Sequence, residues 1–170
     1  MILNNFTQRA LQVFVLPFSF FIIHCGSGPA IPNGASSRDE AAIRLIQAVK
    51  HHTETESLII DEESFLKVYL ARFKRDELGQ STNKPEDYWR FHKIHESVGL
   101  QALENRIREY ELRQFRVFWK ETRSNRGVKV HIVDRIEIAT QGEKQIVRAI
   151  KSVIESGGTF QVLSMGTNSD

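Results

Sequence analysis

The sequence has 170 residues, of which 41% are hydrophobic and 26% are charged. These proportions are typical of a globular chain with one domain of ordinary size, and they exclude a disordered or fibrous protein. The 23 Lys and Arg residues nearly balance the 21 Asp and Glu residues, for a net charge of +2. Because both signs are interspersed along the chain, we expect no nucleic acid partner.

The first feature in chain order is an apolar segment, Ala10–Ile23, which follows Arg9. It is shorter than the roughly 20 apolar residues that a membrane-spanning helix needs. Its length and flanks suit the hydrophobic part of a signal peptide. We therefore predict a signal peptide over residues 1–24, a flexible tether over 25–37, a single domain over 38–166 and a disordered tail over 167–170.

Cys25 is the single cysteine of the chain and lies where the apolar segment ends. This position resembles the bacterial lipobox, in which a signal peptidase cleaves just before a cysteine that becomes lipidated. The resemblance implies a lipid on Cys25 and a membrane-anchored protein of the cell envelope, at the outer membrane if the cell has one. His24 departs from the pattern, which has Gly, Ala or Ser at this place. The alternatives are a secreted or periplasmic protein cleaved after Gly28 or Ala30, and an uncleaved anchor.

Helical signals fill the first part of the predicted domain. A capping box at Ser37–Glu40 opens a helix that ends near His51. Asp61 caps a second helix, and Pro85 opens a third at its first position. Gly99 marks a point where the third helix could be interrupted. The second helix carries an apolar stripe that should face the core, formed by Leu66, Tyr69, Leu70 and Phe73.

Beyond Phe115 the hydrophobic period changes from that of a helix to that of a strand. Apolar residues alternate with polar ones over 115–120 and 128–132, and Ile136 and Ile138 continue the second alternation with the same parity. Turn signals lie at 124–127, 141–142 and 157–158, and the Gly-Gly pair in the last suits a tight hairpin. The pattern predicts an α+β fold whose N-terminal helices pack on a curved, four-stranded antiparallel meander sheet.

Residues 143–155 also fit a helix, which leaves a second architecture open. Ile146, Val147, Ile150, Val153 and Ile154 form a helical stripe. Residues 140–143 could be the capping box of that helix and Gly157 its end. The alternative fold therefore ends in strand–helix–strand.

Helices followed by a curved meander resemble the nuclear-transport-factor-two-like (cystatin-like) group of α+β cones, over residues 61–165. The segment Ser152–Leu163 is similar to the closing hairpin of such domains. Segments 64–70, 85–89 and 99–103 resemble uncharacterised exported bacterial lipoproteins. The group includes enzymes, ligand-binding modules and assembly adaptors, so the resemblance implies a cone-shaped fold without selecting a function.

Candidate site residues are few. His92 and His95 are three residues apart on one helix, which differs from the His-Glu-x-x-His pattern of zinc enzymes, and we expect no metal and no cofactor. In cone-shaped folds a helix histidine and a strand carboxylate can form an acid–base pair, and His92 or His95 with Asp134 is the candidate pair. Surface histidines and a strand-edge or bulge charge are the simpler interpretation of these residues.

The sequence therefore favours an exported, lipid-anchored envelope protein that acts as a non-catalytic binding or assembly module. Its expected partners are the membrane, through the lipid on Cys25, and a small apolar ligand or an envelope protein. One alternative is a small enzyme that uses the histidine–aspartate pair in a cone-shaped pocket. Another is a purely structural envelope component.

Overall fold

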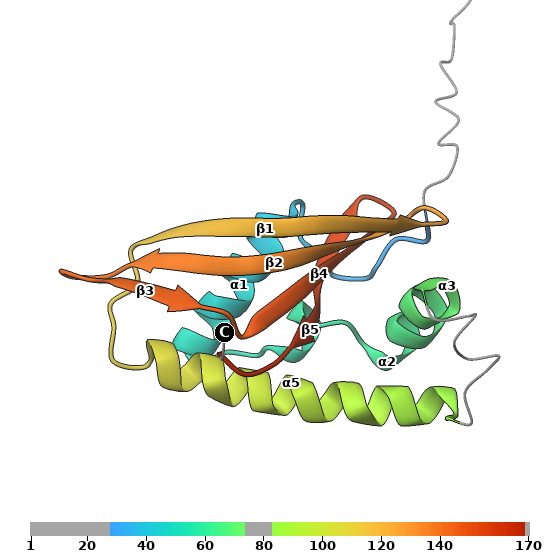
Figure 1. The fold of residues 1–170 in the computed structure, drawn as a ribbon, viewed down its shortest axis with the longest axis horizontal. Helices are drawn as coiled ribbons and strands as arrows, with labels where there is room; N and C mark the ends of the chain where they lie inside the picture. Colours follow the sequence, from blue (N-terminus) through green and yellow to red (C-terminus); the bar gives the residue numbers. More distant parts are fainter. Residues whose placement is uncertain (1–27, 74–82, 169–170) are drawn as a thin grey trace, which may run out of the picture.

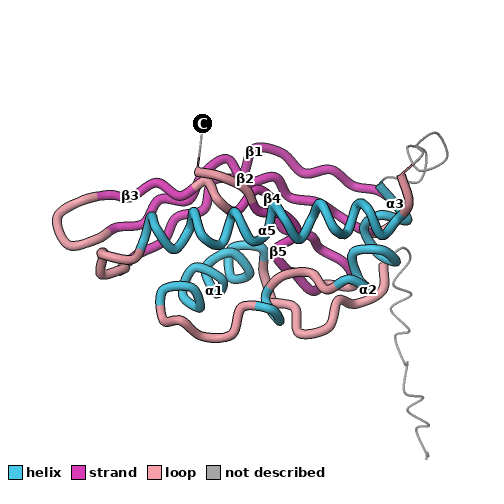
Figure 2. Tube along the Cα trace, turned by 90° about the horizontal axis from the view of Figure 1, so that it is seen from below, coloured by secondary structure: helices cyan, strands magenta, loops and turns pink. Residues whose placement is uncertain are grey.

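The computed structural model describes residues 28–73 and 83–168, which form helices and an open antiparallel sheet (Figure 1). The predicted α+β class is therefore confirmed. Helix α1 (Arg38–Lys50) and helix α5 (Pro85–Ile107) both lie beside the sheet. Figure 2, seen from below, shows α5 running along the length of the sheet and α1 next to it. Among the described residues, no helix is both long enough and apolar enough to cross a membrane.

The sheet has five strands in an extended meander. They are β1 (Gln114–Asn125), β2 (Val128–Ala139), β3 (Lys144–Val147), β4 (Ile150–Ser156) and β5 (Thr159–Met165). Hydrogen bonding gives the order β1-β2-β4-β5, and β3 also pairs with β2. Strands β3 and β4 follow each other along the same edge of β2, since Ile136 pairs with Val147 and Ile132 with Ser152. The sheet has five strands where four were predicted, because the segment expected to be one strand is interrupted between Val147 and Ile150.

The helical alternative for residues 143–155 is wrong. This segment lies within the sheet, where side chains on both of its faces are buried. Val153 packs in the cluster that contains α1, while its neighbour Ile154 packs in a second cluster with Phe65. When both faces of a strand are buried, polar residues no longer alternate with apolar ones along the sequence, and the period of two is lost. A run of Ile and Val then fits a helix as well as a strand.

Two of the predicted turns are the loops of tight hairpins. Asn125 pairs with Val128 and Ser156 with Thr159, so each loop has two residues. Gly157 and Gly158 both have positive φ, 60° and 81°. Such a loop needs this conformation at both positions, and glycine adopts it without a steric penalty.

The expectation that β2 keeps one parity throughout is wrong, because of a β-bulge at Asp134. Phe118 pairs with Arg135 and Trp119 pairs with Val133, which leaves Asp134 as an extra residue. An extra residue reverses the alternation of the side chains beyond it. Accordingly Val128 and Val130 belong to the second cluster, whereas Val133, Ile136 and Ile138 belong to the α1 cluster.

The second predicted helix is one continuous helical stretch of three parts. It consists of α2 (Glu62–Ser64), the π-helix η2 (Phe65–Leu70) and α3 (Ala71–Phe73), and Asp61 accepts a hydrogen bond from the Ser64 amide. A short 3-10 helix, η1 (Glu56–Leu58), precedes it. Of the predicted stripe, Leu70 is buried, and Leu66, Tyr69 and Phe73 are half-buried. Phe65 and Val68 are also buried, so the buried face is wider than the stripe.

Helix α5 continues through Gly99 without interruption. A Cβ atom at Gly99 would lie 2.4 Å from the Cβ of Met165 and 2.7 Å from the amide nitrogen of Gly166. The missing side chain therefore allows α5 to lie directly on the end of β5.

Residues 28–36 pack against the domain, although the sequence predicts a flexible tether there. Ile31 is 2% exposed. The amide of Ala35 donates to the Phe160 carbonyl over 2.7 Å, and the Phe160 amide donates to the Ala35 carbonyl over 3.1 Å. At the other end, the Asn168 side chain donates to the Ala102 carbonyl. The folded unit thus begins before residue 38.

Candidate ligand-binding site

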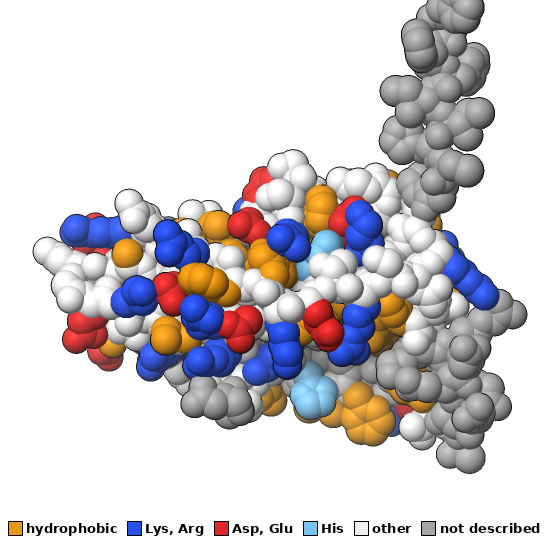
Figure 3. All heavy atoms as spheres, turned by 45° about the horizontal axis from the view of Figure 1, so that its top comes forward, with side chains coloured by type: hydrophobic (Ala, Val, Ile, Leu, Met, Phe, Trp, Pro, Cys, Tyr) orange, Lys and Arg blue, Asp and Glu red, His pale blue; other side chains and the backbone are white. Residues whose placement is uncertain are grey.

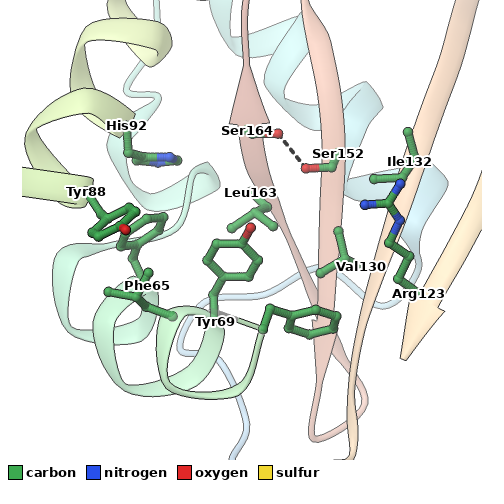
Figure 4. Close-up of a pocket in the computed structure, with 12 residues that line it drawn as sticks. Phe65, Tyr69, Tyr88, His92, Arg123, Val130, Ile132, Ser152, Leu163 and Ser164 are labelled. Carbon is green, nitrogen blue, oxygen red and sulfur yellow. Dashed lines mark hydrogen bonds between the residues drawn. The ribbon is translucent and has the colours of Figure 1, made fainter. Parts of the chain in front are cut away.

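A cavity of about 540 Å³ lies between the helical layer and the sheet (Figure 4). One wall comes from η2, α3 and the first half of α5, and the other comes from β1, β2, β4 and β5. The lining residues are Phe65, Tyr69, Leu70, Phe73, Tyr88, His92, Arg123, Val130, Ile132, Ser152, Leu163 and Ser164. Known small-molecule sites have volumes of about 300 to 1,000 Å³, so this cavity is large enough for a ligand.

Aromatic rings from the π-helix form much of the helical wall. The Phe65 ring lies 5.4 Å from that of Tyr69 and 4.6 Å from that of His92, between ring centroids. The Tyr69 and Phe73 rings stack at 5.7 Å. Tyr69 and Phe73 are half-buried, line the cavity and pack against the second core cluster. Rings that contact each other in this way form a fixed apolar surface.

The polar groups of the cavity are mostly hydroxyls. Ser152 and Ser164, on the neighbouring strands β4 and β5, hydrogen-bond to each other. Arg123 lies on the sheet side, and its Nε donates to Glu121 over 2.9 Å. The lining therefore combines apolar side chains with polar groups from about half of its residues, an arrangement that can bind and orient a small molecule.

His92 lies within the aromatic wall and is deeply buried, with a side chain 7% exposed. Its ring stacks on Trp89 at 5.1 Å. Burial, with the nearby charges of Lys93 and His95, lowers the pKa of His92 to about 4. The imidazole is therefore neutral at pH 7. Its Nε2 atom and the buried Oε2 atom of Glu96 lack hydrogen-bond partners among the described residues and lie 3.9 Å apart.

The candidate acid–base pair does not form. His92 lies in the cavity wall, whereas His95 is exposed on α5. Asp134 is the exposed bulge residue and forms an ion pair with Arg135. Arg135 also pairs with Glu137, and Figure 3 shows a face of the molecule on which positive and negative side chains are interspersed. Of the three candidates, only His92 lines the cavity described above, and Cys25 lies outside the described residues.

A second buried histidine, His131, has a hydrogen-bond network that the sequence did not reveal. Its Nδ1 atom lies 2.9 Å from Thr122 Oγ1, and its Nε2 atom lies 2.9 Å from Glu155 Oε2. Arg38 at the start of α1 lies 3.4 Å from the same Nδ1 atom. Burial lowers the pKa of His131, although the hydrogen bond and the charge of Glu155 oppose this effect. The network joins α1 to three strands.

Part of this network could have been found from the sequence. A two-residue loop at Arg126-Gly127 fixes the register of the hairpin and places Thr122 opposite His131. Glu155 could not have been found in the same way, because its strand assignment was ambiguous.

No cluster of three or more potential metal-binding side chains occurs in residues 28–73 and 83–168. Comparison with known proteins found no matching family, no matching curated protein and no matching solved structure. The chemistry of the cavity is therefore the main guide to function.

Proposed function

We propose that this protein is an exported, lipid-anchored binding module that holds a small, mainly apolar ligand in the cavity between η2 and the sheet. The observation that carries the proposal is the cavity of about 540 Å³ with its aromatic wall. The apolar side chains that line this cavity, among them Phe65, Val130 and Leu163, offer a surface that a ligand of matching shape can contact. A ligand would make these contacts and remove apolar surface from water.

The arrangement of titratable groups favours binding over catalysis. An acid–base pair needs two groups within hydrogen-bond reach beside a bound substrate. His92 is the histidine in the cavity wall, and Asp134 is bonded to Arg135 instead. His131 and Glu155 do form a pair, but neither is among the lining residues of the cavity.

The cellular location rests on the N-terminal sequence. The apolar segment Ala10–Ile23 and the small residues after Cys25 support export and lipidation. One acyl chain gives marginal membrane binding and two or more give stable anchoring. Intact mass of the mature protein, with cell fractionation of the Cys25→Ser variant, tests this part. We expect a lipidated N-terminus at Cys25 and release of the variant from membranes; a mature protein with unmodified Cys25 would contradict it.

Ligand binding can be tested with the neutral fluorescent probe N-phenyl-1-naphthylamine. We expect saturable binding of one probe per protein. Ile132→Trp places a large ring in the cavity and should weaken probe binding at least tenfold. The matched control is Ile94→Trp, because Ile94 is 53% exposed on α5 and does not line the cavity. Absence of saturable binding, or equal binding by Ile132→Trp, would refute the binding module and favour a purely structural envelope component.

A further inference from the structure

We propose that the cavity selects a small monocarboxylate with an apolar aromatic or aliphatic body, whose carboxylate binds Arg123. This inference rests on the proposed function and adds the chemical class of the ligand. Three observations carry it: the charge of the lining residues, the hydrogen bonds of Arg123 to Glu121, and the position of Arg123 relative to the apolar side chains.

The charge of the cavity is one-sided. Arg123 is the one residue with a charged side chain at pH 7 among the described residues that line the cavity. The other polar groups are the hydroxyls of Tyr69, Tyr88, Ser152 and Ser164 and the imidazole of His92. Burial keeps this imidazole neutral, since the pKa of His92 is lowered to about 4. The lining residues include no carboxylate that would oppose an anionic ligand, although Glu121, outside the lining, accepts hydrogen bonds from Arg123; a cationic ligand would meet the arginine.

The guanidinium of Arg123 can accept a new partner. Its Nε and Nη2 atoms both donate to a single oxygen of Glu121. The two side chains are 66% and 43% exposed, and exposed ion pairs of this kind contribute little to stability. Guanidinium groups bind carboxylates through two parallel N–H donors, which is stronger and more specific than a contact with one oxygen. A ligand carboxylate could therefore replace or share the Glu121 contact.

The position of Arg123 suits a ligand with one polar end. Figure 4 shows the guanidinium beside Ile132 on the sheet side, opposite the rings of Phe65 and Tyr69. A carboxylate at Arg123 would leave the ligand body between Ile132, Val130 and the aromatic wall. An apolar body suits the part of the cavity beside Ile132, Val130 and Phe65, because a polar group buried against these side chains would lack a hydrogen-bond partner.

The test compares octanoate, 1-octanol and octylamine, which share one chain and differ in the end group. Each competes with N-phenyl-1-naphthylamine on the full chain. We expect octanoate to bind about tenfold or more tightly than 1-octanol, because a hydrogen bond to a charged group is stronger than one to a neutral group. Octylamine should bind most weakly. 3-Phenylpropanoate should likewise bind more tightly than 3-phenylpropanol.

Variants connect this preference to Arg123. Arg123→Gln should abolish the advantage of octanoate and leave 1-octanol affinity unchanged. Arg116→Gln is the matched control, because Arg116 is also exposed on β1 and does not line the cavity. Glu121→Gln should raise octanoate affinity severalfold by releasing the guanidinium.

The outcomes separate this inference from the proposed function. Equal binding of octanoate and 1-octanol, or an octanoate preference that survives in Arg123→Gln, would overturn the carboxylate assignment while the binding module stands. Tighter binding of octyl phosphate than of octanoate would also overturn it. If neither the probe nor any of these compounds binds, both proposals fail.

Discussion

At the scale of single residues, two histidines are buried in the part of the chain that the structure describes, and their surroundings differ. His92 is surrounded by rings and a nearby carboxylate, and its Nε2 atom has no hydrogen-bond partner among the described residues. His131 is bonded on both ring nitrogens, to Thr122 and Glu155. Burial lowers both pKa values, and for His131 the hydrogen bond and the charge of Glu155 oppose this effect. Protonation in the folded protein is therefore more unfavourable for His92 than for His131.

The buried state of His92 predicts a loss of stability in acid. Its pKa of about 4 in the folded protein lies below its ordinary value of 6.5, so the unfolded chain binds more protons between these values. The contribution of His92 to the free energy of unfolding is complete above pH 6.5. It should fall by about 3 kcal/mol as the pH is lowered to 4.

Urea unfolding at pH 7 and pH 4 measures this effect. His92→Phe keeps a ring next to Phe65 and Trp89. In this variant the difference in the free energy of unfolding between pH 7 and pH 4 should shrink by about 3 kcal/mol. His95→Phe should reduce it only slightly, because His95 is exposed and its charge is the smallest of the causes that lower the pKa of His92. An NMR titration that places the His92 pKa near 6.5 would contradict the prediction.

At the scale of elements, small local irregularities decide which side chains meet. The bulge at Asp134 divides β2 between two core clusters. The π-helix at Phe65–Leu70 carries Phe65, Tyr69 and Leu70, which line the cavity. The close approach of α5 to β5 depends on the glycine at position 99. Each irregularity changes packing within a regular element.

Gly99→Ala tests the contact between α5 and β5. Alanine is better than glycine in a helix interior by about 1 kcal/mol. Here its Cβ atom would overlap Met165 Cβ and the Gly166 amide, and overpacking costs about 1 to 3 kcal/mol. Because part of the obstacle is backbone, we expect a net loss of about 1 kcal/mol in urea unfolding. Ser97→Ala, at an exposed position of the same helix, should stabilise by about 0.5 kcal/mol. A Gly99→Ala protein more stable than the parent would disprove the contact.

At the scale of the whole molecule, the segment before α1 is part of the folded unit. Ser156 Oγ donates to the Pro29 carbonyl over 2.6 Å, and the Gln161 side chain donates to the Pro32 carbonyl over 3.1 Å. Ile31 is buried in the second cluster with Phe65 and Val68. If Cys25 is the mature N-terminus, little chain separates the proposed lipid from these contacts.

Ile31→Ala tests whether this segment stabilises the domain. Loss of a buried isoleucine side chain costs about 2 to 5 kcal/mol, and we expect about 3 kcal/mol in urea unfolding. Ile94→Ala should change stability by about 0.5 kcal/mol or less, because Ile94 is exposed. Equal small effects of the two substitutions would indicate that residues 28–36 are a free tether.

The sequence by itself determined the fold class, the helix starts at Ser37, Asp61 and Pro85, and the positions of the hairpin loops. These features depend on residues close together in the chain, through capping, backbone conformation and hydrophobic period. Only the tertiary structure decided whether residues 143–155 form strands or a helix. It also decided which face of β2 each side chain occupies and which residues line the cavity.

The same distinction explains the outcome for the candidate site. His92 could be named from the sequence, but its neighbours could not. Asp134 is exposed at the bulge and pairs with Arg135. Phe65, Arg123 and Ser164 meet around one cavity although they come from η2, β1 and β5. Contacts between distant segments depend on register, bulges and helix packing. One inserted residue reverses the faces of a strand, so local patterns alone could not determine them.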